Sequence, residues 1–291
     1  ARMVPKGEIG PREIAVLNSP LRISAYFVES LSRMQRSQEH NRGDQTNLIE
    51  TKDKDQIVER MYNDYIREES YFFDNADCSK WGPSQLSFVL YLVLGSRIKN
   101  TYIRTLLRRQ LELFSNKVIK LPVNVTLKAT HSDIQSGSMV NKMLSKISHL
   151  DPSLGDSRLS YLNASEGMFQ GVLGNTSSIL AADCLRLSSK ILSKITLNGV
   201  SCDIKVKPFD TSDDVVRGIS FNSKAIKPFQ MFHLDSTVSK VINGHFGIKR
   251  NDYKSTYSMY VCEFNSRFLT FNGYFKADMK SRLSFVDFCS S

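Results

Sequence analysis

Hydrophobic and polar positions alternate along the chain with two different periods. Ile57, Met61 and Tyr65 recur at i, i+4 spacing and predict a helix over residues 55–69. Residues 37–52 are polar and charged and predict a loop. Four other stretches have the composition of helices, the last of them after a glycine-rich start: 21–31, 82–114, 139–149 and 167–195.

Strand-like stretches lie between these helices. Residues 202–209 alternate with period two, and residues 215–221 would form their antiparallel partner across a turn at Asp210–Asp214. Shorter strands are expected at 71–74, 118–127 and 257–264. No internal repeat is visible, so the pattern alone predicts an α+β or α/β protein.

Composition narrows the class of protein. The chain has 291 residues, a net charge of +10, 41% hydrophobic residues, 17 Phe and 11 Tyr. This excludes a disordered chain and a small scaffold that depends on disulfides. The positive charge favours a polyanionic partner, although a basic excess can also serve solubility alone.

Cysteine and membrane signals add little chemistry. The five cysteines are widely spaced and form no CxxC unit, a pattern that suits a reducing compartment. The longest apolar stretch, residues 87–94, is less than half of a membrane span, so no span is expected.

Three carboxylates stand out by their context. Asp77 follows an aromatic strand, and Asp213 and Asp214 are adjacent in the predicted hairpin turn. Carboxylates that converge from such rigid places can hold a pair of divalent cations, and Mg²⁺ prefers oxygen ligands. The alternative is that the adjacent aspartates only stabilise the turn.

Basic residues concentrate between residues 97 and 128, where eight Lys or Arg accompany one acid, Glu112. Arg97, Arg104 and Arg108 would fall near one face of a helix. Such a face could follow a phosphate backbone, or it could simply be solvated.

Five segments occur in the order expected of an RNA-dependent RNA polymerase, and this order is more specific than any one of them. They resemble the L protein of bunyaviruses, which are segmented negative-strand RNA viruses, with a leaning toward the nairovirus branch. The segments are 6–14, 77–81, 166–178, 212–214 and 251–266.

The first two segments resemble polymerase motifs F and A. The resemblance implies that Lys6 and Arg12 line the path of the nucleotide phosphates, which Arg can grip with two hydrogen bonds. Asp77 would be a metal ligand, and Lys80 would contact phosphate or stabilise the site. Trp81 completes the DxxKW form of motif A and is expected to serve packing.

The third segment resembles motif B, a loop that leads into a helix. Gly171 would let this loop flex, and Gln170 would hydrogen-bond template or nucleotide. Ser177 and Ser178 follow in the motif, where serines also cap helices.

The remaining segments resemble motifs C, D and E. Asp213 would be the principal metal ligand and Asp214 a close second, while Asp210 adds a charge that the family pattern does not explain. Lys254 would be the general acid that protonates pyrophosphate. Glu263 would support the metals or a primer-side strand.

The resemblance implies a right-hand polymerase fold. Residues 1–70 would contain the fingertip and fingers helices, and residues 71–291 an α+β palm, an antiparallel sheet flanked by helices, with a fingers insertion around 97–165. Neither end of the chain reads as a natural terminus, so we expect a piece of a larger protein that is inactive when isolated.

The function implied is RNA-templated RNA synthesis from nucleoside triphosphates for viral replication and transcription, with two Mg²⁺ or Mn²⁺ ions. Partners would be template and product RNA, the remaining parts of the L protein and nucleoprotein-coated RNA, in the host cytoplasm and the virion. Two alternatives stay open: a metal-dependent nuclease that uses the same carboxylates, and a non-catalytic RNA-binding module.

Overall fold

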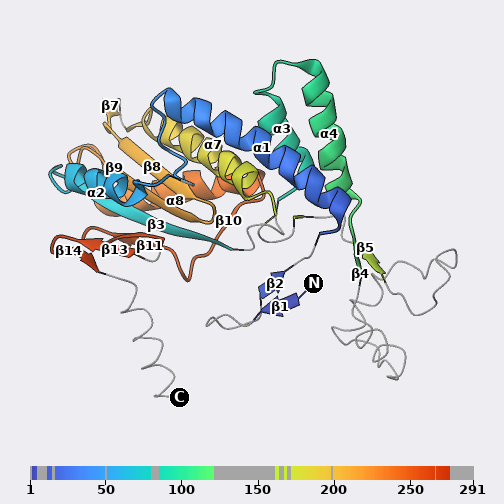
Figure 1. Cartoon of the computed structure of the whole chain (residues 1–291). Coiled ribbons are helices and arrows are strands. Elements are labelled where there is room, and N and C mark those ends of the chain that lie inside the picture. The colour runs from blue at the N-terminus through green and yellow to red at the C-terminus, as the bar shows by residue number, and fades with distance from the viewer. Residues whose placement is uncertain are drawn as a thin grey trace, which may run out of the picture. The chain divides into compact units, whose positions relative to one another are not determined.

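The computed structural model describes ten ranges of the chain: residues 2–4, 12–14, 17–49, 51–79, 85–120, 161–163, 167–168, 172–197, 199–265 and 267–275. In these ranges the protein is α+β, with six helices and antiparallel sheets (Figure 1). The helices are α1 (Ser19–Asn41), α2 (Lys54–Tyr65), α3 (Ser87–Gly95), α4 (Thr101–Ser115), α7 (Gly174–Leu192) and α8 (Pro228–His245). The strands are β1 (Arg2–Val4), β2 (Arg12–Ile14), β3 (Tyr71–Ser79), β4 (Val118–Lys120), β5 (Tyr161–Asn163), β6 (Thr196–Leu197), β7 (Val200–Ser201), β8 (Lys205–Thr211), β9 (Asp214–Ser220), β10 (Lys249–Arg250), β11 (Thr256–Ser258), β12 (Cys262–Phe264), β13 (Arg267–Thr270) and β14 (Gly273–Phe275).

The chain divides into two compact units. One unit comprises residues 1–30 and 82–173, and the other comprises residues 31–81 and 174–291. The second unit contains residues from both sides of the domain boundary that was expected at residue 70. The fingers insertion expected around 97–165 falls inside the first unit.

A central antiparallel sheet organises the second unit. Its strands run in the order β10-β3-β9-β8, and β11 also pairs with β3 (Figure 1). The predicted antiparallel pairing of residues 202–209 with 215–221 is confirmed as β8 and β9. The turn is shorter than predicted, because Asp210, Thr211 and Asp214 belong to the strands and only two residues remain between them.

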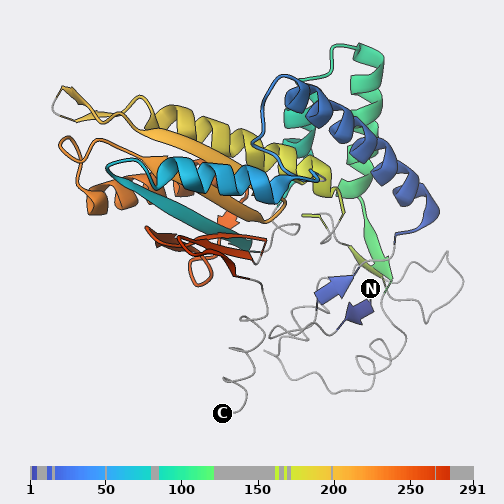
Figure 2. The ribbon, with the colours of Figure 1, turned by 60° about the vertical axis from the view of Figure 1, so that its left-hand side comes forward.

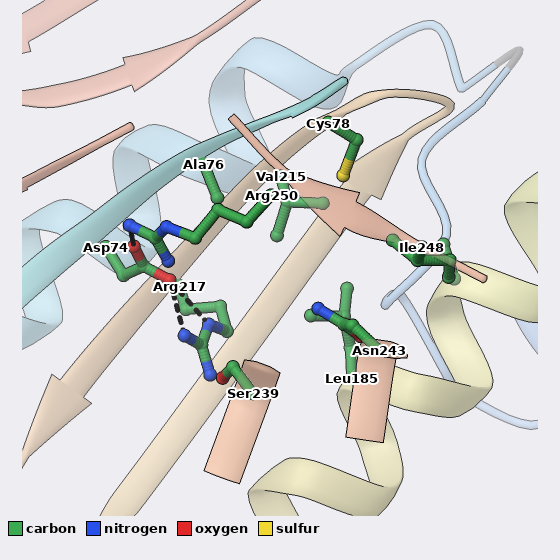
Figure 3. A pocket seen from close by; sticks show the side chains of 11 residues that line it. Asp74, Ala76, Cys78, Leu185, Val215, Arg217, Ser239, Asn243, Ile248 and Arg250 are labelled. Atoms are coloured by element: carbon green, nitrogen blue, oxygen red, sulfur yellow. Dashed lines mark hydrogen bonds and ion pairs between the residues drawn. The ribbon is translucent and has the colours of Figure 1, made fainter. Parts of the chain in front are cut away.

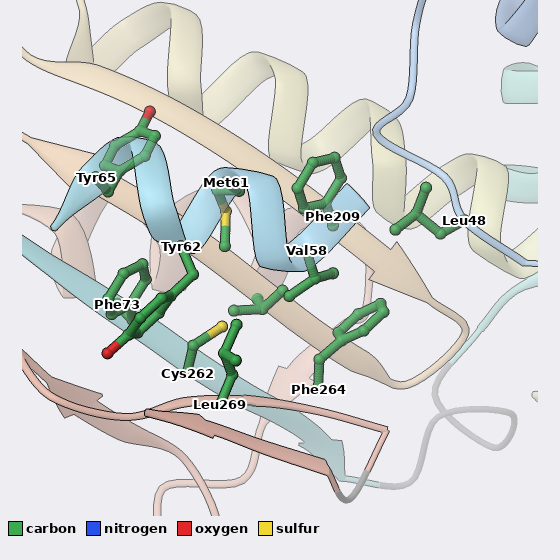
Figure 4. Packing of buried hydrophobic residues seen from close by; sticks show 11 residues of the cluster. Leu48, Val58, Met61, Tyr62, Tyr65, Phe73, Phe209, Cys262, Phe264 and Leu269 are labelled. Atoms are coloured by element: carbon green, nitrogen blue, oxygen red, sulfur yellow. The ribbon is translucent and has the colours of Figure 1, made fainter. Parts of the chain in front are cut away.

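The two faces of this sheet carry different apolar clusters. Phe72 and Ile219 face α7 and α8, where they pack with Leu192 and Met231. The opposite face packs against α2 and the β12–β13 hairpin (Figures 2 and 4). Successive residues of a strand point to opposite faces, so the position of a residue in β3, β8 or β9 decides which cluster it joins.

Helix α2 covers this opposite face of the sheet with apolar side chains at the i, i+4 spacing seen in the sequence. Met61 and Tyr65 are buried, together with Val58 and Tyr62, which confirms an amphipathic helix here (Figure 4). The helix ends at Tyr65, so the end predicted at residue 69 is wrong. Gly218 of β9 lets α2 approach closely. A Cβ atom at this position would lie 3.1 Å from the Met61 sulfur and 3.1 Å from the Tyr65 ring.

In the first unit, the single helix predicted over 82–114 is wrong, because the described part of it forms two helices. Helix α3 ends at Gly95 and α4 begins at Thr101. Asn100 caps α4, since its side-chain oxygen accepts a hydrogen bond from the Ile103 amide at 3.1 Å. In the part of the chain that is described, no helix is long and apolar enough to cross a membrane.

Other boundaries also differ from the expected ones. Helix α1 continues to Asn41, so the loop predicted from residue 37 is wrong at its start; Glu39 there forms an ion pair of 2.8 Å with Arg186 of α7. The strand expected at 257–264 is two strands, β11 and β12. The helix predicted over 139–149 lies outside the described residues.

Candidate active site

Two of the predicted metal ligands face each other across neighbouring strands. Asp77 of β3 is the register partner of Asp214 of β9. The Cys78 amide donates to the Asp213 carbonyl at 3.1 Å, the pattern that flanks a non-hydrogen-bonded pair. The Cα atoms of such a pair are about 4.5 Å apart, and both side chains lie on one face of the sheet.

Asp213 lies in the tight turn beside this pair. Ser212, the other turn residue, has a φ of 68°, a conformation that favours glycine. Its amide donates to the Ser178 hydroxyl of α7 at 2.9 Å, and Thr211 donates to the Asn265 side chain at 2.6 Å. The turn that carries Asp213 is therefore held from both sides.

Lys254 lies close to the carboxylate of Asp77. Its Nζ atom lies 3.7 Å from Asp77 Oδ2, with the two side chains 55% and 24% exposed. The loop around it is bonded to the backbone of Asp77: the Asn251 amide donates to the Asp77 carbonyl at 2.8 Å, and the Asp77 amide donates to the Ser255 hydroxyl at 3.1 Å. A basic side chain and a carboxylate thus meet at a solvent-accessible edge.

Glu263 is fixed near this edge through its backbone. The Glu263 amide donates to the Asn75 side-chain oxygen at 2.8 Å, and the Asn75 amide group donates to the Val261 carbonyl at 3.0 Å. Asn75 lies two residues before Asp77 and so on the same face of β3. The described residues nevertheless contain no group of three His, Cys, Asp or Glu side chains that could hold a metal ion.

The two facing carboxylates, Asp77 and Asp214, still fit a divalent cation such as Mg²⁺ that takes few ligands from the protein. Mg²⁺ is often bound by one or two protein carboxylates and completes its shell with water and phosphate oxygens. Like charges directly opposite each other on a sheet destabilise it, and a cation would remove that cost at Asp77 and Asp214. The pair suits an ion that arrives with phosphates, and it does not form a cage made of protein alone.

The remaining predicted site residues are placed less completely. Arg12 belongs to β2, but its side chain is outside the described residues. Ser177 is buried in α7, and its neighbour Ser178 contacts the turn. The other predicted residues of the site lie outside the described residues: Lys6, Lys80, Trp81, Gln170 and Gly171.

Asp210 does not belong to the carboxylate pair. Its register partner is Val215, so it lies on the α7 face, opposite to Asp77 and Asp214. It is fully buried, and neither carboxylate oxygen has a hydrogen-bond partner among the described residues. Burial raises its pKa well above the usual value, and the nearby Arg186 offsets this only in part.

A buried ionic network also lies on the α7 face of the sheet, around the middle of β3 and β9 (Figure 3). Arg217 donates to Asp74 at 3.0 Å, and Arg250 donates to Asp74 at 2.6 Å. Arg217 also donates to Asp235 at 2.8 Å. Burial opposes ionisation of Asp74, but Arg217 and Arg250 outweigh it and lower its pKa. The Tyr257 hydroxyl donates to Asp235 at 3.1 Å.

This network was not predicted from the sequence, although the sequence contains a signal for part of it. Asp74 and Arg217 are charged residues inside otherwise apolar strands, and they are register partners. Opposite charges at facing positions of two predicted strands are a recognisable pair once the register is known. The Arg217 and Asp235 contact, by contrast, joins a strand to α8 and has no local pattern.

Together these contacts bring two acids and one basic side chain from distant parts of the sequence to one edge of the sheet. Such a set can bind cations and phosphates. No known protein family matches the chain, and a search of curated proteins finds no match.

Proposed function

We propose that the chain belongs to an enzyme that synthesises RNA on an RNA template from nucleoside triphosphates. One observation carries the proposal: Asp77 and Asp214 are register partners on neighbouring strands, with Lys254 at 3.7 Å from Asp77. These residues come from three separate segments that resemble polymerase motifs A, C and D. In this proposal the central sheet is the palm, flanked by α7 and α8 on one face and by α2 on the other.

The reaction would join the 3′ oxygen of the growing RNA to the α-phosphorus of the triphosphate. The bond from that phosphorus to the bridging oxygen breaks, and pyrophosphate leaves. Asp77, Asp213 and Asp214 would hold two Mg²⁺ or Mn²⁺ ions, which activate the hydroxyl and neutralise the phosphates when bound. The proton of the 3′ hydroxyl passes to solvent.

Lys254 would donate a proton to the departing pyrophosphate. A lysine ammonium carries protons at neutral pH, and a positioned acid accelerates the loss of a charged leaving group. Its distance from Asp77 fits this role, because the leaving phosphates would lie beside the same carboxylate. Lys6, Arg12 and Lys80 would contact the phosphates, and Gln170, Gly171 and Ser177 the template or nucleotide.

The wider proposal follows from the same resemblance. The enzyme would be the L protein of a segmented negative-strand RNA virus and would act on nucleoprotein-coated RNA in the host cytoplasm and in the virion. The fold class and the geometry of the carboxylate pair support it, together with the order of the five segments.

Primer extension by the full-length protein tests the proposal. With template, primer, one nucleoside triphosphate and Mg²⁺, Asp214→Asn should lower incorporation by at least about 100-fold, the scale of losing one strong electrostatic contact. Asp64→Asn is the matched control, because Asp64 is an exposed carboxylate of α2. Undiminished synthesis by Asp214→Asn would refute the assignment.

The same assay separates the alternatives. A nuclease would cleave RNA with Mn²⁺ in the absence of nucleoside triphosphates. An RNA-binding module would bind RNA and incorporate nothing, and Asp214→Asn would leave its affinity unchanged.

A further inference from the structure

Arg250 lies outside the catalytic set and is attached to it through the loop that carries Lys254. Residues 251–255 form this loop between β10 and β11. Both strands pair with β3, with Arg250 opposite Cys78 and Thr256 opposite Asn75. The loop therefore leaves and rejoins the sheet on either side of the register position of Asp77.

The side chains that flank the loop contact each other. The Arg250 guanidinium carbon lies 4.8 Å from the centre of the Tyr257 ring, the geometry of a cation–π contact. These residues stand just before and after the loop, so their contact closes its base.

The base of the loop is also tied to the buried ionic network. Arg250 is nearly buried and donates to Asp74 at 2.6 Å (Figure 3). Tyr257 donates to Asp235 at 3.1 Å. Arg217 holds both acids in place from the middle of the sheet. An ionic group in such a dry setting resists displacement, because separating the partners would leave a buried charge unpaired.

Within the loop, the backbone is folded by local hydrogen bonds. The Asn251 carbonyl accepts from the Lys254 amide at 3.1 Å and from the Ser255 amide at 2.9 Å. The Asn251 side chain accepts from the Tyr253 amide at 3.2 Å. The loop is thus a small folded turn whose orientation depends on its two ends.

We infer that Arg250 is a positioning residue, which fixes the Lys254 ammonium beside Asp77 through its contacts with Asp74 and Tyr257. This inference rests on the proposed function, because it assigns Lys254 a task in the reaction. The contacts themselves do not depend on which reaction is catalysed.

A double-mutant cycle in the full-length protein tests the inference. In single-nucleotide incorporation, Arg250→Gln should lower kcat by about 10- to 100-fold, the scale of misplacing a reacting group by about 1 Å. The KM for the nucleoside triphosphate should change by less than about twofold, because the phosphate ligands are untouched. In a Lys254→Gln background, Arg250→Gln should add less than about twofold, since there is no ammonium left to position.

A merely structural role gives a different result. If Arg250→Gln lowers kcat by the same factor with and without Lys254, or not at all with Lys254 present, the inference is overturned. If Arg250→Gln unfolds, Arg250→Lys replaces it in the test. Arg250→Lys keeps the positive charge beside Asp74, so it should retain the fold and give an intermediate kcat. Lys205→Gln removes an exposed ion pair with Glu68 and serves as the control for lost surface charge.

Hydrogen exchange separates this inference from the proposed function. Amides 251–255 should exchange faster in Arg250→Gln than in the unmodified protein, whereas the amides of α2 should not change. Unchanged exchange in the loop would show that Arg250 does not anchor residues 251–255. A further outcome is that the unmodified protein incorporates no nucleotide while the loop still exchanges faster in Arg250→Gln. In that case Arg250 anchors the loop, but both the proposed function and the positioning role fail.

Discussion

Two facing pairs on β3 and β9 have opposite electrostatic character. Asp74 faces Arg217, and the buried charges compensate each other. Three residues along, Asp77 faces Asp214, so two acidic residues occupy facing positions that are partly exposed. The first pair favours a stable sheet, and the second favours the binding of a cation at some cost to the sheet.

Lys254 should matter for the chemical step more than for binding. Lys254→Gln in the full-length protein should lower kcat by about 10²- to 10⁴-fold, the usual contribution of a general acid, with a smaller change in KM. Single-nucleotide incorporation under rapid mixing measures both constants. Lys224→Gln, which changes an exposed lysine before α8, should leave them unaltered.

An increased KM with an unchanged kcat would contradict the role of Lys254 as an acid. That result would leave it as a group that only neutralises phosphate.

Asp210 should make the protein less stable as the pH rises. Its pKa is raised in the folded state, so the folded protein binds more protons than the unfolded chain above about pH 4. Its contribution to stability therefore falls as pH rises toward the raised pKa, by up to about 1.4 kcal/mol per pH unit. Asp210→Asn, which keeps the shape and removes the titration, should be the more stable form at pH 7.

Urea unfolding at several pH values checks this difference, and Asp64→Asn gives the behaviour of an exposed carboxylate. Other buried acids contribute slopes of their own, but the difference between Asp210→Asn and the parent isolates one group. A constant difference from pH 5 to pH 8 would show that Asp210 is ionised in the fold.

At the scale of elements, the close packing of α2 on β9 depends on a glycine. Gly218→Ala would bring a methyl group within 3.1 Å of Met61 and of the Tyr65 ring. We expect a loss of about 1–3 kcal/mol from overpacking, because both neighbours are buried. Thermal or urea unfolding measures the change.

Gly244→Ala is the matched control, because it lies in α8 with no neighbouring atom within 4 Å of the added carbon. It should stabilise the protein by up to about 1 kcal/mol through helix propensity. Equal or greater stability of Gly218→Ala would contradict the packing at β9.

The elements whose existence the sequence predicted well are those with a clear period, although their ends were placed less well. Helix α2 and the β8–β9 hairpin follow from apolar spacing and from the polar turn between the strands. The break between α3 and α4 was missed because the apolar pattern continues through it, and the Asn100 cap decides the boundary. The extension of α1 beyond residue 37 carries the ion pair between Glu39 and Arg186, a contact distant in sequence that no local pattern reveals.

The candidate site was predictable only in part, because part of its geometry depends on strand register and on contacts between distant segments. The motif-like segments identified Asp77, Asp213, Asp214 and Lys254, and the strand register brings Asp77 opposite Asp214. The position of Asp210 on the other face depends on where the turn begins, which the sequence placed too early. The support from Arg250 and Tyr257 required the three-dimensional arrangement of the loop.

At the scale of the whole molecule, the net charge of +10 should make RNA binding depend strongly on salt. Each released counterion adds to the slope, so affinity for single-stranded RNA should fall steeply from 50 to about 200 mM salt. Filter binding with the full-length protein measures the slope. Asp77→Asn and Asp214→Asn should bind RNA as well as the unmodified protein or better, because each removes a negative charge.

A shallow salt dependence, or loss of RNA binding in either aspartate variant, would contradict this division between binding and catalysis. The first result would indicate that the basic excess serves solubility, and the second that the carboxylates support the RNA-binding surface itself.

The most direct measurement of the central claim is cleavage of the polypeptide by bound iron. With Fe²⁺ in place of Mg²⁺ and with ascorbate and peroxide, radicals cut the backbone beside the metal. If the two carboxylates share an ion, the full-length protein should be cut near both Asp77 and Asp214, and excess Mg²⁺ should suppress both cuts. The single substitution Asp77→Asn should abolish both cuts. Cuts at neither place, or loss in Asp77→Asn of only the cut near residue 77, would show that the two carboxylates share no ion.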